Sequence, residues 1–348
     1  MNSSLGYVIV SGRWDDNVAI VDVEMALSAG NDGLSSAVVC RPRVTPDIDT
    51  NGDGMVDAQS SGQPVAVVVD SKADFAYVIN HSGPATREAA ARFQHGHPGL
   101  VAVLNVRTAL DSKVNGTLDA IEAFIPTGRT GPVGSALTPD GRTLLVNCGE
   151  AEGSEDGGDE VTAIDVATRT VSRRIPLELA RRHPATAPST HDSPHPSFGR
   201  YPNPTGLVVS PLHGGVVFVG NGGFSDVSVL DLTRAMAGDA ETEICRVPVE
   251  TGPFGLGLSP KGELVAVAAR ESMSHALEGK TISLISVELA VSGREDAEIA
   301  RVNVGSDNPD EQTRPFAAAF TPDGKYVVAS CFRSNSISFI NVEEAIAG

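Results

Sequence analysis

The sequence predicts an all-β fold, a β-propeller of four-stranded antiparallel blades, and three observations support this prediction. One unit recurs along the 348 residues, Gly (36) and Pro (22) are abundant, and aromatic residues make up only 5% of the chain. Short apolar strands separated by Gly/Pro turns are typical of all-β proteins. Repeats of this size bury their apolar faces by stacking on one another, and radial stacking gives a propeller. We expect a single propeller domain over residues 1–348.

Each repeat opens with a Pro/Gly step into a short apolar run, then makes a tight turn into a second apolar strand. A third, alternating strand ends in Asp or Asn, and a fourth leads to the next Pro/Gly step. The clearest copy begins at Gly131-Pro132, turns at 138–141 and continues through 144–147 and 161–166. Further copies begin at Pro64, Pro204, Pro253 and Pro315. The Thr-Pro-Asp-Gly turn at 138–141 suits a hairpin between the first two strands, because Pro fixes φ and Gly permits a positive φ.

With these repeats, the sequence resembles the YVTN-repeat and lactonase-like propeller family over nearly its whole length. The resemblance implies the propeller fold and a site of His, Glu and Arg residues on one face. It does not fix the reaction, because this fold carries many chemistries.

The two ends of the chain depart from that pattern. The first unit starts at its second strand, 7–10, and the last stops after its third strand, near residue 348. No strand for closing the ring is found. Six units are counted, and three alternatives stay open: unconventional closure, a seventh blade, or a partner chain that completes the ring.

The long connections are expected to share one face, because fourth-to-first connections and second-to-third loops leave a blade on the same side. Seven of the eight histidines lie on these connections. Imidazole is a frequent metal ligand and a general acid or base near neutral pH. His81 is expected to end a second strand, where Cys148 and Cys331 stand in their blades. The candidate catalytic residues are His81, Glu150, His191 and His195.

Arginines recur beside first and second strands on the same face. Five of them, in a chain with net charge −18, suggest a carboxylate or phosphate ligand held by paired N–H donors. The alternative is pairing with nearby acidic loops. The candidate substrate-binding residues are Arg13, Arg200, Arg270, Arg314 and Arg333.

An inserted loop at 47–60 resembles the calcium loop of EF-hand and dockerin proteins. Alternating oxygen ligands and a central glycine let a tight loop surround a hard cation. The twelfth position carries Ser60 in place of a bidentate acid. The calcium ligands carried over by position are Asp49, Asn51, Asp53, Met55 and Asp57.

The net charge of −18 argues against nucleic-acid and membrane partners, because an acidic surface repels phosphate groups. No signal peptide is visible in the sequence. A cytoplasmic location is the default expectation, and an extracytoplasmic one applies if a signal has been removed. The four cysteines show no metal or disulfide spacing and are expected to be buried.

Three functions remain open. The favoured one is a lactonase-like hydrolase or lyase that acts on a small anionic substrate and contains structural calcium. The second is an oxidoreductase with copper or iron at the histidines, which are the candidate ligands of a second divalent or transition metal. The third is a non-catalytic propeller that binds a ligand or protein.

Overall fold

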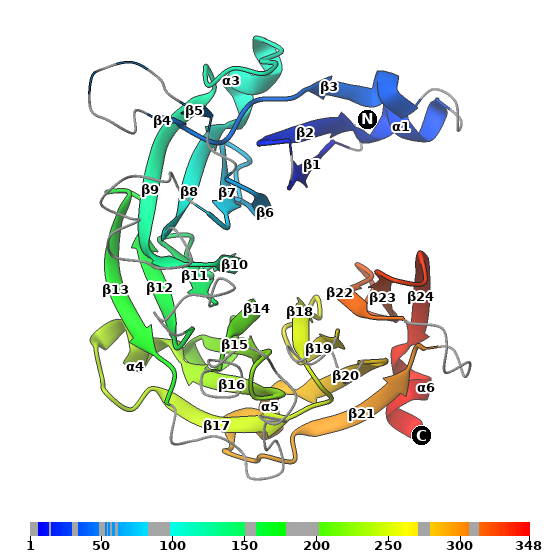
Figure 1. Ribbon diagram of the computed structural model, residues 1–348. Coiled ribbons are helices and arrows are strands. Elements are labelled where there is room, and N and C mark those ends of the chain that lie inside the picture. The colour runs from blue at the N-terminus through cyan, green and yellow to red at the C-terminus, as the bar shows by residue number, and fades with distance from the viewer. Residues whose placement is uncertain are drawn as a thin grey trace. The chain divides into compact units, whose positions relative to one another are not determined.

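The computed structural model describes residues 6–13, 15–29, 34–48, 53, 55, 58–59, 62–82, 98–149, 158–178, 202–270, 279–305 and 313–348. The described residues form six antiparallel sheets of three or four strands, which are the blades of a six-bladed β-propeller (Figure 1). The helices between them are short. The predicted fold class is therefore confirmed, with the six units that the repeats indicate.

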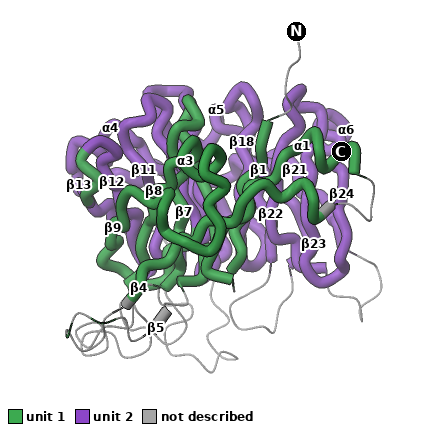
Figure 2. Tube along the Cα trace, turned by 90° about the horizontal axis from the view of Figure 1, so that it is seen from above, with its two compact units in different colours: residues 1–133, 154–156, 168–170 green, residues 134–153, 157–167, 171–348 purple. Residues whose placement is uncertain are grey.

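The chain divides into two compact units (Figure 2). The first comprises residues 1–133 with 154–156 and 168–170, and the second comprises the remaining residues.

The first unit holds blades 1 and 2. Blade 1 consists of β1 (Tyr7–Gly12), β2 (Asn17–Asp22) and β3 (Val38–Cys40). Blade 2 consists of β6 (Pro64–Val69), β7 (Phe75–Asn80), β8 (Pro98–Asn105) and β9 (Ile121–Thr130). A separate hairpin of β4 (Asp47–Ile48) and β5 (Ala58–Gln59) lies between the two blades in sequence.

The second unit holds blades 4 to 6 and most of blade 3. Blade 3 consists of β10 (Pro132–Leu137), β11 (Thr143–Cys148), β12 (Glu160–Asp165) and β13 (Thr170–Pro176). Blade 4 consists of β14 (Pro204–Ser210), β15 (Val216–Asn221), β16 (Asp226–Asp231) and β17 (Glu243–Pro248), with η4 (Leu212–Gly214) in its first turn. Blade 5 consists of β18 (Pro253–Leu258), β19 (Leu264–Ala269), β20 (Thr281–Ser286) and β21 (Glu298–Asn303), and blade 6 of β22 (Pro315–Phe320), β23 (Tyr326–Cys331) and β24 (Ser336–Asn341).

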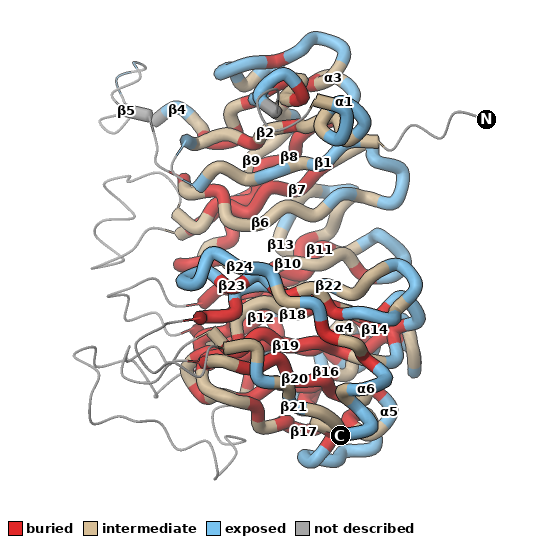
Figure 3. The backbone as a smooth tube through the Cα atoms, turned by 90° about the vertical axis from the view of Figure 1, so that its right-hand side faces the viewer, coloured by how far each residue is buried: buried red, intermediate tan, exposed pale blue. Residues whose placement is uncertain are grey.

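Blades 1 and 6 have three described strands, as the sequence predicts. Blade 1 begins at the strand that is second in the other blades, and blade 6 ends at the third. Apolar side chains are exposed on both, and Ile337 and Phe339 on β24 are 64% and 71% exposed. Figure 3 shows the exposed stretch along β24 beside the buried strands of blade 5.

A short helix follows the third strand in five blades, and its first turn is capped by the last residue of that strand. Asp22 accepts from the backbone N–H of Met25, and Asp231 accepts in the same way from Arg234. Asp, Asn and Ser suit this position because their side-chain oxygen bonds a free N–H of the first turn. The helices are α1 (Val23–Ser28), α3 (Val106–Asp111), α4 (Leu232–Ala237), α5 (Val287–Val291) and α6 (Val342–Ala347), and η1 (Leu34–Ala37) follows α1.

The Thr-Pro-Asp-Gly turns form hairpins between first and second strands, as predicted. Thr138 Oγ1 donates to Asp140 Oδ1 at 2.6 Å, and Gly141 has φ 69°. Asp323 holds the blade 6 turn with the same bond from Thr321, at 2.6 Å. These side-chain bonds lower the pKa of Asp140 and of Asp323, because they stabilise each carboxylate.

The core lies between the faces of neighbouring blades. In the first unit, Val18 and Ile20 of blade 1 pack with Val78 and Leu104 of blade 2. In the second unit, similar clusters join blade 3 to blade 4, blade 4 to blade 5 and blade 5 to blade 6. Strands buried on both faces explain the nearly continuous apolar runs in the sequence. The four cysteines are buried, as expected.

Candidate functional site

A repeated backbone arrangement marks one end of each blade from 2 to 6. The residue before the first-strand proline has a left-handed backbone, at Gln63 (φ 50°), Gly131 (60°), Asn203 (47°), Gly252 (64°) and Arg314 (50°). A β-bulge follows the proline in blades 2, 4, 5 and 6. A left-handed backbone costs a non-glycine residue about 1–2 kcal/mol. Backbone conformation alone would therefore favour glycine over Gln63, Asn203 and Arg314.

The residue after the second strand is hydrogen-bonded to that pre-proline residue. The N–H groups of His81, Gly222 and Arg270 donate to the carbonyls of Gln63, Asn203 and Gly252 at 3.1, 3.1 and 2.9 Å. Phe332 donates to Arg314 in the same way, at 3.0 Å. Blades 2, 4, 5 and 6 therefore have two paired positions at this end, one before the first strand and one after the second. Arg13 and Gly149 are the equivalent residues after β1 and β11.

The predicted register of His81 is wrong by one residue. Asn80, not His81, matches Cys148 and Cys331, because these three end their second strands. Side chains alternate between the faces of a strand, so a shift of one residue changes the face. His81 lies beyond the strand, at the position of Arg13 and Arg270.

Arg13, Gln63 and His81 form a polar cluster in the first unit, which we call the His81 cluster. Arg13 Nε and Nη2 both donate to Gln63 Oε1, at 3.3 and 3.1 Å. The His81 side chain is half-buried, and its buried Nδ1 has no hydrogen-bond partner. Burial, and then the charge of Arg13, lower the pKa of His81 from 6.5 to about 4. His81 is therefore a neutral imidazole at pH 7.

Asp16 supports the backbone of this cluster. Its Oδ1 accepts from the N–H of Gly62 at 2.8 Å, directly before Gln63. Burial raises the pKa of Asp16. Asn80 is fully buried beneath Gly62, where a Cβ would meet Asn80 Oδ1 at 3.0 Å. The residue at 62 must therefore be small, which fixes the path of the chain into Gln63.

Arg270, Arg314 and Arg333 lie at the equivalent end of blades 5 and 6, in the second unit. Arg270 stacks over the rings of Phe254 and Phe316, with 4.8 and 5.5 Å from guanidinium carbon to ring centroid. Arg333 lies 5.8 Å from the ring centroid of Phe332. Arg314 is 9% exposed. The sequence predicts these three arginines near a ligand, but it did not single out the aromatic rings against which two of them lie.

The calcium-like loop falls between β4 and β5 in the sequence, and these strands pair Asp47 with Gln59 and Ile48 with Ala58. Two of its candidate ligands are described: the Met55 N–H donates to Asp53 Oδ1 at 2.8 Å. At the base of the hairpin, Arg43 binds Asp47 Oδ1 at 2.6 Å. Asp49, Asn51 and Asp57 lie outside the described residues.

The other candidate residues also lie outside the described residues: Glu150, His191, His195 and Arg200. Within the described part of the chain, no group of three or more His, Cys, Asp or Glu side chains could hold a metal ion. Among the described helices, none is long and apolar enough to cross a membrane.

A buried ion network in blade 4 was not predicted. The Arg246 side chain is 1% exposed, and its Nε and Nη1 lie 2.6 and 3.6 Å from Glu243 and Asp226, whose side chains are 0% exposed. Arg246 Nη2 also donates to the carbonyl of Glu178, at 2.7 Å, and the Glu178 N–H donates to Glu243 Oε2, at 3.0 Å. The network therefore fixes the segment that follows β13.

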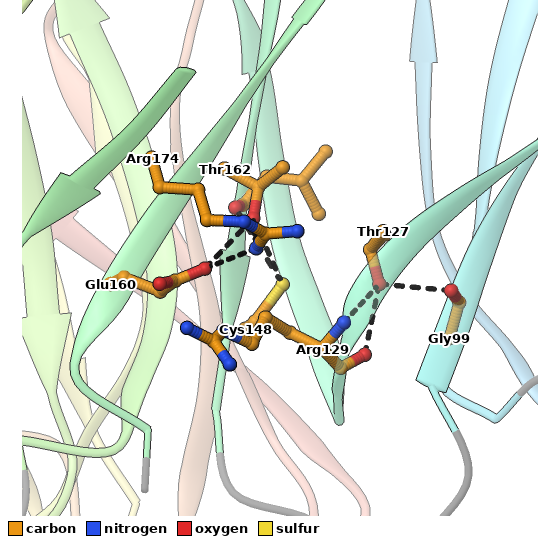
Figure 4. A network of polar contacts seen from close by, with 8 residues as sticks. Gly99, Thr127, Arg129, Cys148, Glu160, Thr162 and Arg174 are labelled. Carbon is orange, nitrogen blue, oxygen red and sulfur yellow. Dashed lines mark hydrogen bonds and ion pairs between the residues drawn. The ribbon is translucent and has the colours of Figure 1, made fainter. Parts of the chain in front are cut away.

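The same place in β13 carries Arg174, whose guanidinium binds Glu160 (Figure 4). Thr162 lies between this ion pair and the buried Cys148 thiol, 3.6 Å from its Sγ. Arginine thus recurs in the fourth strands of blades 3 and 4, each time bound to the acidic residue that starts the third strand, Glu160 or Asp226.

No protein-family model matches the chain, and no curated protein matches it. Solved structures with the same fold include hydrazine synthase of Kuenenia stuttgartiensis, with TM-score 0.59 and 16% identity, covering 97% of this chain and 80% of that one. They also include a periplasmic gluconolactonase of Pseudomonas aeruginosa, with TM-score 0.55, 16% identity, and 96% and 81% of the two chains. A protein provisionally named 6-phosphogluconolactonase from Bacteroides uniformis has TM-score 0.58, 14% identity, and 97% and 78% covered. At these identities the likeness shows the fold.

Proposed function

We propose that the chain is a lactonase-like hydrolase that acts on a small anionic lactone at the His81 cluster. The observation that carries the proposal is a half-buried, neutral imidazole whose buried Nδ1 has no partner and which feels the charge of Arg13. A base next to a cation is what ester hydrolysis requires, since water must lose a proton while the carbonyl oxygen gains charge. Two propellers of similar fold are named as lactonases, which supports this reaction class.

The proposed reaction uses the three residues in sequence. His81 takes a proton from water as the water oxygen forms a bond to the lactone carbonyl carbon. Arg13, held by Gln63, stabilises the negative charge on the carbonyl oxygen. The ring C–O bond then breaks, and the leaving oxygen takes the proton back from His81. The product is the open-chain hydroxy acid, and the cluster returns to its starting state.

The low pKa of His81 favours an anionic substrate. In the free protein the imidazole is a weak base, because burial and the Arg13 charge both disfavour its protonated form. An anion bound beside Arg13 would offset that charge and raise the pKa of His81. The base then becomes effective when the substrate is in place.

The test is hydrolysis of a panel of lactones, with and without a carboxylate or phosphate group, by the wild type and His81→Gln. We expect the wild type to prefer anionic lactones and His81→Gln to lose about 100-fold in kcat. Arg13→Gln should also lose turnover of anionic lactones, and Arg107→Gln, which removes an exposed arginine on α3, is its matched charge control. Equal turnover by His81→Gln and wild type, or binding of anionic lactones without turnover, would contradict the proposal; the latter would leave a ligand-binding propeller.

We also propose that the tip of the β4–β5 hairpin binds one calcium ion through Asp49, Asn51, Asp53, Met55 and Asp57. The hairpin pairing and the Asp53 turn support the proposal. Bound calcium would stiffen this loop and would take no part in the proton transfers.

Calcium titration by calorimetry should give one site per chain in the wild type and none in Asp53→Ala, because the loop loses a charged ligand. Asp111→Ala, at an exposed position on α3, should bind like the wild type. Unchanged binding by Asp53→Ala would refute this site.

A further inference from the structure

Five side chains form a continuous aromatic and cationic surface on blades 5 and 6, which we call the Phe–Arg ladder. Phe254 and Phe316 directly follow the first-strand prolines of their blades, and Arg270, Phe332 and Arg333 follow second strands. All five belong to the second compact unit.

The ladder has a defined stacking order. The rings of Phe254 and Phe316 lie 4.4 Å apart at an interplanar angle of 42°, and Phe316 and Phe332 lie 6.0 Å apart at 40°. Arg270 covers the first pair, and Arg333 lies over the third ring. Such contacts hold a guanidinium by its flat face, so its N–H edges project sideways. An anion beside the rings can therefore be met by in-plane donors.

Packing of the repeat does not require these rings. The positions equivalent to Phe254 and Phe316 hold Val65, Val133 and Thr205 in blades 2 to 4. The small polar side chain of Thr205 is accommodated at that position in blade 4. Its Oγ1 donates to the carbonyls of Gly220 and Pro253 at 3.0 and 2.7 Å. The aromatic residues of blades 5 and 6 therefore serve something outside the repeat.

The rings are also open to solvent next to positive charge. Phe316 is 37% exposed and Phe332 is 55% exposed. Exposed aromatic area beside guanidinium groups is unusual on a chain of net charge −18, and it complements a ligand that combines an apolar ring with an anionic group. A fully hydroxylated sugar acid would match the arginines and leave the rings unused.

We propose that the Phe–Arg ladder binds a small ligand in which a carboxylate or phosphate is carried on a flat, apolar ring. The ring stacks at Phe316 and Phe332, and the anion meets the guanidinium edge of Arg333. The ladder belongs to the second compact unit and the His81 cluster to the first, so this binding proposal is independent of the proposed function.

The experiment is calorimetric titration of the intact protein with phenyl phosphate, with inorganic phosphate, gluconate and benzyl alcohol as comparison ligands. Phenyl phosphate should bind at one site, at least about tenfold more tightly than each comparison ligand, because only it uses rings and guanidinium together. Phe332→Ala and Arg333→Gln should each weaken it by about tenfold.

Two variants serve as matched controls. Phe339→Ala removes an exposed phenylalanine of the same blade, and Arg294→Gln removes an exposed arginine of the same unit. Both should bind like the wild type. Equal affinity for phenyl phosphate and inorganic phosphate, no binding at millimolar ligand, or equal weakening by the control variants would each overturn the proposal. Because binding is measured, loss of lactone turnover in His81→Gln neither supports nor undermines this result.

Discussion

Replacing Arg246 with Met is expected to destabilise the protein by about 3–5 kcal/mol. The substitution leaves the carboxylates of Glu243 and Asp226 without their cation, and both side chains are 0% exposed. Water cannot reach them to compensate, and the Glu178 carbonyl loses a donor as well. The measurement is the free energy of unfolding from urea denaturation.

Blade 5 provides the control for Arg246→Met, because its fourth strand has a similar sequence. Glu243-Ile244-Cys245-Arg246-Val247 and Glu298-Ile299-Ala300-Arg301-Val302 occupy the same register of their fourth strands. The Arg301 and Glu298 side chains are 43% and 18% exposed, so Arg301→Met should cost at most about 1 kcal/mol. Similar losses in the two variants would show that burial does not set the value of the blade 4 network.

The second large effect is a dependence of stability on pH that originates at His81. Its pKa is about 4 in the folded protein against 6.5 as the ordinary value. Between these two values the unfolded chain binds a proton that the folded chain does not, so stability rises with pH across this window. Lowering the pH from 6.5 to 4 should therefore remove about 3 kcal/mol of folding stability through this group.

His81→Gln should abolish this contribution, so the difference between variant and wild type should change by about 3 kcal/mol between pH 6.5 and 4. Arg13→Gln should raise the pKa of His81, since the Arg13 charge is one of the two causes of its depression. Arg107→Gln should leave it unchanged. An NMR titration of the His81 ring that gives its ordinary value in the wild type would rule out this account.

The strands and hairpins could be predicted because each depends on local chemistry that repeats. The Pro-Asp-Gly turns contain their own hydrogen-bond partners, and runs of Val, Ile and Ala suit strands buried on both faces. The Asp or Asn that ends most third strands belongs to the repeat, but the repeat does not reveal its capping role, because five- or six-residue helices have no room for an amphipathic period.

The site residues were harder to predict because they depend on strand register and on which distant segments bury them. His81 was selected for its chemistry, yet placing it required knowing that β7 ends at Asn80. The sequence does not indicate Gln63 as a site residue, because a polar residue before a proline is typical of an ordinary turn. Nothing in the local sequence separates Arg246 from Arg301. The difference arises from the Leu177–Glu178 segment, which is about 70 residues away in the chain and contributes backbone groups to Arg246 and Glu243.

The paired positions before the first strand and after the second make the blades interchangeable for protein engineering. In blade 4 they hold Asn203 and Gly222, which carry the same backbone hydrogen bond as Gln63 and His81 in blade 2. A Cβ at Gly222 would lie 3.2 Å from Thr205 Cγ2, a contact that a shift of a few tenths of an ångström relieves. Substituting Gln and His at these two positions would place two of the three residues of the His81 cluster in another blade. A pair of site residues can thus be introduced into another blade by two substitutions, with no change to the strands that support them.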